Sequence, residues 1–208
     1  MGNDSPGFHN LLTEKQQQYS VYSMSNKYSK LNTEEQQLAK QHRMKYTVQD
    51  GFPYYIELLG NTSYKQLFSS QENFSILETI GEEKANHRYA PNKWSIKQIV
   101  GHMTDHERIM TYRALRFSRK DATQLPGYDQ DLFVDNSRFD ELSFQQLITD
   151  FKNVRNATNS FIDTLSDLQL SLKGVAWKYE LTVEDFLKAT VGHEVHHITI
   201  IKNTYLNS

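Results

Sequence analysis

The stretch TVEDFLKATVGHEVHHITII, Thr182 to Ile201, carries the strongest structural pattern in the sequence. Its first residue is a typical helix N-cap, and two acids follow in the first turn, where they favour the helix dipole. Residues of one face then recur at steps of four, three, four and four: Phe186, Thr190, His193, His197 and Ile201. This period predicts a helix whose buried face carries His193 and His197 one turn apart.

Three further helices are expected upstream. Capping boxes, in which a serine is followed three residues later by glutamine, mark starts at Ser95 and Ser143, and the apolar stripes that follow run to about residues 120 and 165. An earlier stripe over residues 64–79 predicts the first long helix. The polar connection 121–142 is long, and connections of this length often wrap a site. Residues 174–179 alternate weakly, as in extended chain. Four long helices with one long crossover predict an all-α four-helix bundle.

The N-terminal part has a different composition. Residues 1–43 are rich in Ser, Asn, Gln, Lys and Tyr and contain few aliphatic side chains. Such a segment buries too little apolar surface to offset its conformational entropy. We therefore expect a disordered or loosely attached extension over 1–43 and a folded domain over 44–208.

The overall composition narrows the classes of function. The chain has 25 acidic and 23 basic side chains and a formal charge of −2, which gives no basic footprint for nucleic acid or for an anionic membrane. It has no cysteine, so any metal must be held by imidazole or oxygen. Neither a membrane-spanning apolar run nor a secretory signal is visible in the sequence, and a cytoplasmic protein is expected.

His193 and His197 place two imidazoles on one helix face, where both can bind one cation. An open metal site takes a third protein ligand, and His102 lies on the apolar face of the second predicted helix, beside Ile99 and Met103. These three histidines are the predicted metal ligands. A histidine on an apolar face is also often an ordinary core residue, and from spacing alone that alternative remains open.

Two other histidines need placing. His106 follows His102 by four residues, so the second helix offers a pair of its own, and His106 competes as a ligand. His196 is rotated by about 100° from its neighbour on a helix, and we expect it at the rim of the site or at the surface.

Glu194 lies between the two histidines, so the stretch matches the His-Glu-x-x-His pattern of metalloproteases, with the glutamate as general base. Such proteases usually take a further ligand from downstream, and residues 198–208 contain no His, Asp or Glu. This disfavours a protease. Glu194 remains a candidate acid–base group or a support for the ligands, and its alternative is an ordinary solvated residue.

Several blocks of the sequence resemble the DinB-like superfamily, in order and with matching spacing, over roughly residues 46–206. They are YAPNKWSIKQIVGH at 89–102, YRAL at 112–115, PGYD at 126–129 and GHEVHH at 192–197. The resemblance implies an up-down-down-up four-helix bundle. It also implies a divalent metal, nickel or zinc in many relatives, held by His102, His193 and His197. It argues against His106, which stands where relatives commonly carry a small polar residue.

The resemblance further implies a metal-dependent enzyme with a small-molecule substrate, and a homodimer. Relatives with assigned activity include thiol S-transferases that use bacillithiol, mycothiol-dependent isomerases and metal-dependent hydrolases. The first hypothesis is therefore transfer of a bacillithiol-like low-molecular-weight thiol onto an electrophile. The alternatives are hydrolysis by metal-bound hydroxide and a metal-binding module without turnover.

Arginines on the second predicted helix are candidates to meet an anionic cosubstrate: Arg108, Arg113, Arg116 and Arg119. The alternative is that they are solvated or paired with nearby acids.

Overall fold

The computed structural model describes residues 44–207. The extension predicted over 1–43 lies outside the described residues, so that expectation and the domain start at Met44 stay predictions. From Tyr46 onward the chain forms one compact unit. No helix in the described range combines the length and the apolar character needed to cross a bilayer.

The elements follow one another along the chain, and the longest connection is the one between α7 and α9. They are the 3-10 turn η1 (Val48–Asp50), the helices α3 (Phe52–Leu58), α4 (Tyr64–Ser69), α5 (Glu72–Glu78), α6 (Glu82–Ala85), α7 (Ile96–Ser118), α8 (Gln130–Asp135), α9 (Phe144–Asp163) and α10 (Asp167–Ser171), the strands β1 (Lys173–Ala176) and β2 (Tyr179–Thr182), the helix α11 (Val183–Ile200) and the π-helical turn η2 (Ile201–Leu206).

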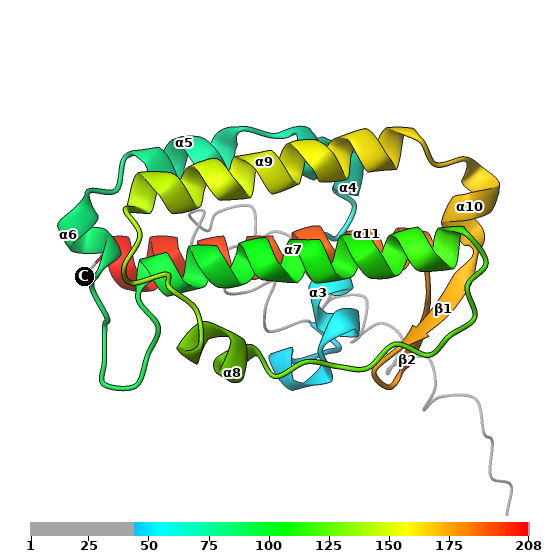
Figure 1. Ribbon diagram of the computed structural model, residues 1–208, viewed down its shortest axis with the longest axis horizontal. Helices are drawn as coiled ribbons and strands as arrows, with labels where there is room; N and C mark the ends of the chain where they lie inside the picture. Colours follow the sequence, from blue (N-terminus) through cyan, green and yellow to red (C-terminus); the bar gives the residue numbers. More distant parts are fainter. Residues whose placement is uncertain (1–43, 208) are drawn as a thin grey trace, which may run out of the picture. The chain divides into compact units, whose positions relative to one another are not determined.

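Three long helices, α7, α9 and α11, form most of the bundle (Figure 1). Helix α7 packs against both α9 and α11, and α4 also contacts both α9 and α11, so short helices take the place of a first long helix. Helices α7 and α9 run in the same direction, joined by the long connection that carries α8, whereas α11 runs the opposite way (Figure 1). The predicted all-α, up-down-down-up four-helix bundle is confirmed.

The prediction of one long first helix over residues 64–79 is wrong, because α4 and α5 are separated at Ser70. The backbone of Ser70 is extended, and its hydroxyl accepts a hydrogen bond from the Glu72 N–H at 3.2 Å. A serine that bonds to nearby backbone in this way offers an alternative to continuing the helix. The apolar stripe also lapses between Phe68 and Phe74, so core packing does not hold the intervening residues in helical register.

The predicted helix starts are confirmed. The hydroxyls of Ser95, Ser143 and Thr182 accept hydrogen bonds from backbone N–H groups in the first turns of α7, α9 and α11. The side chains of Gln98 and Gln146 close the two capping boxes by accepting from the backbone N–H of the capping serines. Local chemistry thus fixes where the three long helices begin.

The weakly alternating stretch forms an antiparallel hairpin of β1 and β2, with Trp177 in its turn. The connection after α7 runs along this hairpin. The backbone N–H of Leu125 donates to the Val175 carbonyl, and the N–H of Trp177 donates to the Leu125 carbonyl, each at 2.9 Å. The hairpin therefore holds the long connection close to the end of α7.

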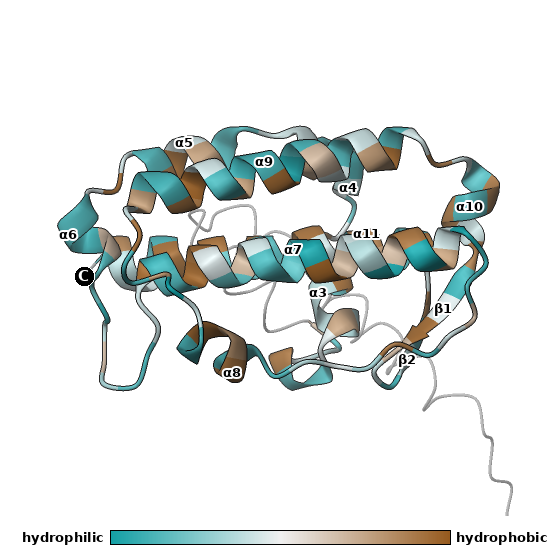
Figure 2. Ribbon diagram, viewed as in Figure 1, coloured by the Kyte–Doolittle hydropathy of each residue, from teal (hydrophilic) through white to brown (hydrophobic). Residues whose placement is uncertain are grey.

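The buried apolar side chains form two clusters. One contains the first turns of α7 and α9 and the end of α11, with Ile96 and Phe151 among its members. The other contains the end of α7, the start of α11 and the hairpin, with Phe117 and Phe186. Figure 2 shows polar turns between apolar ones along α7.

Between the two clusters the long helices contribute buried or half-buried polar side chains, which we call the polar layer: His102, His106, Glu107, Arg155, His193, Glu194 and His197.

Candidate metal centre

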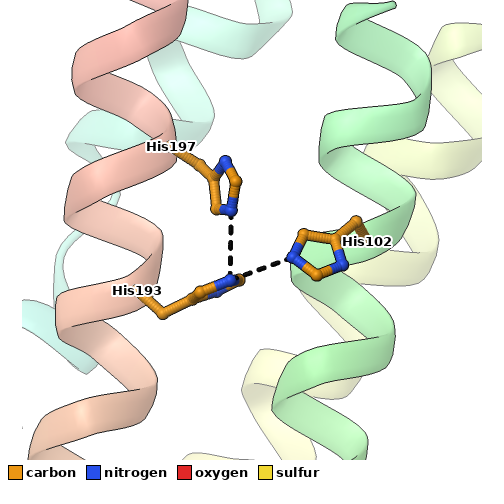
Figure 3. A group of neighbouring side chains, drawn as sticks. All are labelled: His102, His193 and His197. Atoms are coloured by element: carbon orange, nitrogen blue, oxygen red, sulfur yellow. Dashed lines mark hydrogen bonds between the residues drawn. The ribbon is translucent and has the colours of Figure 1, made fainter. Parts of the chain in front are cut away.

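Three imidazoles meet in the polar layer, His102 from α7 and His193 and His197 from α11 (Figure 3). The Nε2 atom of His193 lies 2.9 Å from Nε2 of His102 and 3.0 Å from Nε2 of His197. One ring nitrogen from each residue lies within 4.8 Å of the other two. The fold therefore brings together the three histidines, hereafter the triad, that the sequence predicts as metal ligands.

The two short contacts of His193 cannot both be well-aligned hydrogen bonds. A ring nitrogen offers either one proton or one lone pair, directed along a single line in the ring plane. Nε2 of His193 therefore makes at most one well-aligned hydrogen bond to its two neighbours. Nitrogen ligands about 2.0–2.1 Å from one ion lie about 2.8–3.4 Å apart, and both measured separations fall in that range. The donor set of three imidazoles fits a divalent transition-metal cation.

Burial keeps the triad neutral. It lowers the pKa of His102 from 6.5 to about 4 and holds the pKa of His193 and of His197 well below 6.5. Neighbouring imidazoles add to these shifts, because a second positive charge nearby disfavours protonation. At neutral pH the rings are therefore unprotonated, as metal ligands must be.

Aromatic rings pack against two members of the triad. The ring centroid of Trp94, just before the cap of α7, lies 4.7 Å from that of His102, and Tyr55 of α3 packs edge-on against His193 at 5.1 Å. Gly192 permits the approach of α3, because a Cβ at this position would overlap the Tyr55 carbonyl. Trp94 lies in the block 89–102 that carries the family resemblance, but no role at the site was predicted for it. The sequence did not point to Tyr55, since its position depends on how separate segments pack.

His106, the competing ligand, lies beside the triad and outside the converging set. Its ring stacks on His193 with centroids 3.8 Å apart, and its Nδ1 lies 2.7 Å from the Tyr128 hydroxyl. Burial holds the pKa of His106 well below 6.5. Tyr128 belongs to the long connection after α7, so this connection reaches the polar layer, as its length suggested.

Glu194 belongs to a separate ion network. Arg155 of α9 is 1% exposed and donates to Glu194 Oε2 at 2.5 Å and to Glu107 Oε2 at 2.7 Å. Asn73 donates to Glu194 Oε1 at 2.8 Å. Glu194 is 3% exposed, so the alternative of an ordinary solvated residue is wrong. With both oxygens engaged, the carboxylate is not placed as a general base.

His196 and Gly101 are the chain neighbours of His197 and His102. His196 is half-buried, with Nδ1 3.1 Å from the Tyr54 hydroxyl, and lies outside the converging set. Gly101 permits the close approach of the ring of Phe139, from the segment between α8 and α9. That ring packs on α7 directly beside the position of His102.

Two cavities border the triad. The first, of about 280 Å³, is lined by His193 and His106 together with residues of α3, the hairpin turn and the connection after α7. The second, of about 330 Å³, is lined by His197, Trp94 and Tyr205 among others. Small molecules therefore have room beside two different members of the triad.

Comparison with known proteins places the chain in a family. A family model described as the DinB superfamily matches residues 69–201, more than half of the chain and including the whole triad. A search of curated proteins found no match. The fold is similar to that of YfiT from Bacillus subtilis, described as a probable metal-dependent hydrolase with an unusual four-helix bundle topology. The superposition has a TM-score of 0.58 and 15% sequence identity, and covers 79% of this chain and 91% of YfiT. On the family match, the chain belongs to the DinB superfamily.

Proposed function

We propose that His102, His193 and His197 hold a divalent ion, nickel or zinc, and that this centre supports a metal-dependent reaction of a small molecule. The observation that carries the proposal is the pair of short contacts to one nitrogen, Nε2 of His193, at 2.9 and 3.0 Å. Three neutral imidazole ligands give a centre with a net positive charge and leave coordination positions open for substrate. The chemistry that a divalent ion would supply there is a lowered pKa of a bound thiol or water, and hence a nucleophile at neutral pH.

Transfer of a low-molecular-weight thiol to an electrophile is the reaction that the cavities favour. Such a transfer brings together two organic molecules, and two separate cavities border His193 and His197. The sulphur forms a bond to the electrophilic carbon, the leaving group departs with its electron pair, and the thiol proton is released. The chain's own part is to fix the imidazoles through Trp94 and Tyr55 and to keep them unprotonated by burial.

Hydrolysis is the second candidate, with water as the acceptor in place of a thiol. The observation that favours it is the similarity of this fold to that of YfiT, described as a probable metal-dependent hydrolase. Glu194 is not the base in either reaction, because Arg155 and Asn73 occupy its two oxygens. The family resemblance also implies a homodimer, which light scattering of the full chain in solution would test.

Metal content tests the ligands. Protein purified without an affinity tag should hold about one divalent ion per chain, and His102→Ala and the double variant His193→Ala/His197→Ala should hold almost none. His196→Ala is the matched control, because it removes an adjacent histidine of the same helix from outside the triad. Retention of metal by the triad variants would refute the ligand assignment.

Turnover tests the reaction class. The metal-loaded chain is given a model electrophile with bacillithiol, and separately a panel of esters and amides in water. Conjugation that needs both thiol and metal supports transfer, and thiol-independent release of acid supports hydrolysis. Full metal occupancy without turnover in either assay would refute both reactions and leave a metal-binding module.

A further inference from the structure

Arg113 differs from the other arginines of α7. Arg108 pairs with Asp150 and Arg116 with Asp121. For these two the alternative named from the sequence, pairing with nearby acids, is what the structure has. Arg113 is only 4% exposed, and in the described part of the chain no carboxylate pairs with it. A buried charge without a counter-ion is costly, so this position calls for an explanation.

The contacts of Arg113 use a minority of its donors. One Nη2 proton is donated to the Pro126 carbonyl at 2.7 Å, and Nη1 lies 3.3 Å from the Met110 sulphur, a weak acceptor. The guanidinium carbon lies 6.0 Å from the centre of the Tyr128 ring. A guanidinium has five N–H donors in a planar fork, which matches two oxygens of one carboxylate. Most of that fork has no acceptor among residues 44–207.

Arg113 lines the first cavity, the one that also borders His193. Four of the other lining residues carry large aromatic rings: Phe52, Tyr55, Tyr128 and Trp177. The lining is completed by His106, Gly127 and Gln130. Its volume of about 280 Å³ exceeds the roughly 150 Å³ of an apolar cavity that admits benzene. The rim residue Trp177 is 48% exposed, so the cavity is bordered by solvent-accessible side chains.

We propose that Arg113 anchors the carboxylate of a flat, apolar small molecule in the first cavity, with the opposite end of that molecule toward His193. The aromatic walls suit the flat body, and the guanidinium supplies the counter-charge that the protein itself does not. This deepens the proposed function, on which it rests for the chemistry at His193. The binding of the carboxylate itself does not require the metal, so the two proposals are testable apart.

Benzoate and benzamide are the probes, since they share a ring and differ in charge. Calorimetric titration of the wild-type chain, before and after chelation, should show benzoate binding about tenfold more tightly than benzamide. The preference should persist without metal, be lost in Arg113→Met and be retained in part in Arg113→Lys. Arg116→Met, three residues further along α7, is the control that should keep it.

Three results would overturn the anchor. The first is equal affinity of the wild type for the two probes, or no binding of either, which needs no variant and holds even if Arg113→Met fails to fold. The second is a preference for benzoate that survives in folded Arg113→Met. The third is a preference that disappears on chelation, which would assign the carboxylate to the metal. A chain that binds no metal but prefers benzoate would refute the proposed function alone.

Discussion

On one side of the polar layer Arg155 lies between Glu107 and Glu194; on the other, His193 lies between His102 and His197. The first set joins opposite charges, and a further hydrogen bond from Asn73 completes it. The second set joins three groups of the same kind, whose lone pairs converge. Both are buried at the same level of the bundle.

The difference separates two tasks carried by neighbouring residues. His193 and Glu194 are adjacent on α11, and a step of one residue turns the side chain by about 100°. One direction closes an ion network that ties α7, α9 and α11 together, and the other points His193 toward the two further imidazoles of the proposed metal centre. The ion network has its charges paired within the protein and stabilises the packing of the helices. The triad has three like groups, which we propose a bound cation completes.

The largest effect is expected when the ion network loses its centre. Arg155→Met leaves Glu107 and Glu194 buried without a counter-charge and should lower the free energy of unfolding by about 3–5 kcal/mol. Urea denaturation measures this. Arg138→Met removes an exposed ion pair with Glu141 and should change it by no more than about 1 kcal/mol. Equal effects of the two variants would contradict the comparison.

The triad should stabilise the chain only with metal. At a free concentration of nickel or zinc a hundredfold above its dissociation constant, the free energy of unfolding of the wild type should rise by about 2.7 kcal/mol. His102→Ala, measured at the same metal concentration, should show almost no rise, and His196→Ala should keep it. A full rise in His102→Ala would place the metal elsewhere.

Glu194→Gln tests whether the ion network and the triad act separately. The substitution keeps the shape of the side chain and removes a charged acceptor from Arg155, at a cost of about 2 kcal/mol. Metal content should not change, since Glu194 does not face the triad. A variant that loses metal in proportion to its loss of stability would show that the ion network and the triad are coupled.

Tyr128→Phe has the smallest expected effect. It removes the hydroxyl beside Nδ1 of His106 and should cost about 1 kcal/mol in the free energy of unfolding, with metal content unchanged. Thermal unfolding and metal analysis of the same sample measure both quantities. Loss of metal would instead make His106 part of the centre.

The triad was predictable from the sequence, and the ion network around Arg155 was not. His193 and His197 share a helix face, and His102 lies on an apolar stripe, so local periodicity predicted that the three histidines face the core. The family resemblance then favoured His102 over His106. The partner of Glu194 comes from another helix, and no local pattern connects them. One signal was present: Arg155 continues the buried face of α9 at regular steps, in the series Ile148, Phe151, Arg155, Thr158 and Ile162. A charge at a core position indicates a buried counter-charge.

The fold shows the same division. The three long helices carry their own start signals in Ser95, Ser143 and Thr182, and these were predicted. The break at Ser70 is also local, since its hydroxyl accepts a hydrogen bond from the Glu72 N–H, although it was not predicted. The edge-on packing of Tyr55 on His193 depends instead on a contact between segments far apart in the chain. Local chemistry determined the first kind of feature, and tertiary packing the second.

The division of the apolar core into two clusters has a consequence for cooperativity. Each cluster buries its own set of side chains, and a layer of polar groups lies between them. Regions with separate cores can open with separate free energies, which amide hydrogen exchange resolves. The proposed cation would bridge α7 and α11 within that layer and so link the two clusters. Metal binding should therefore bring the hydrogen exchange of the two ends toward one common opening event.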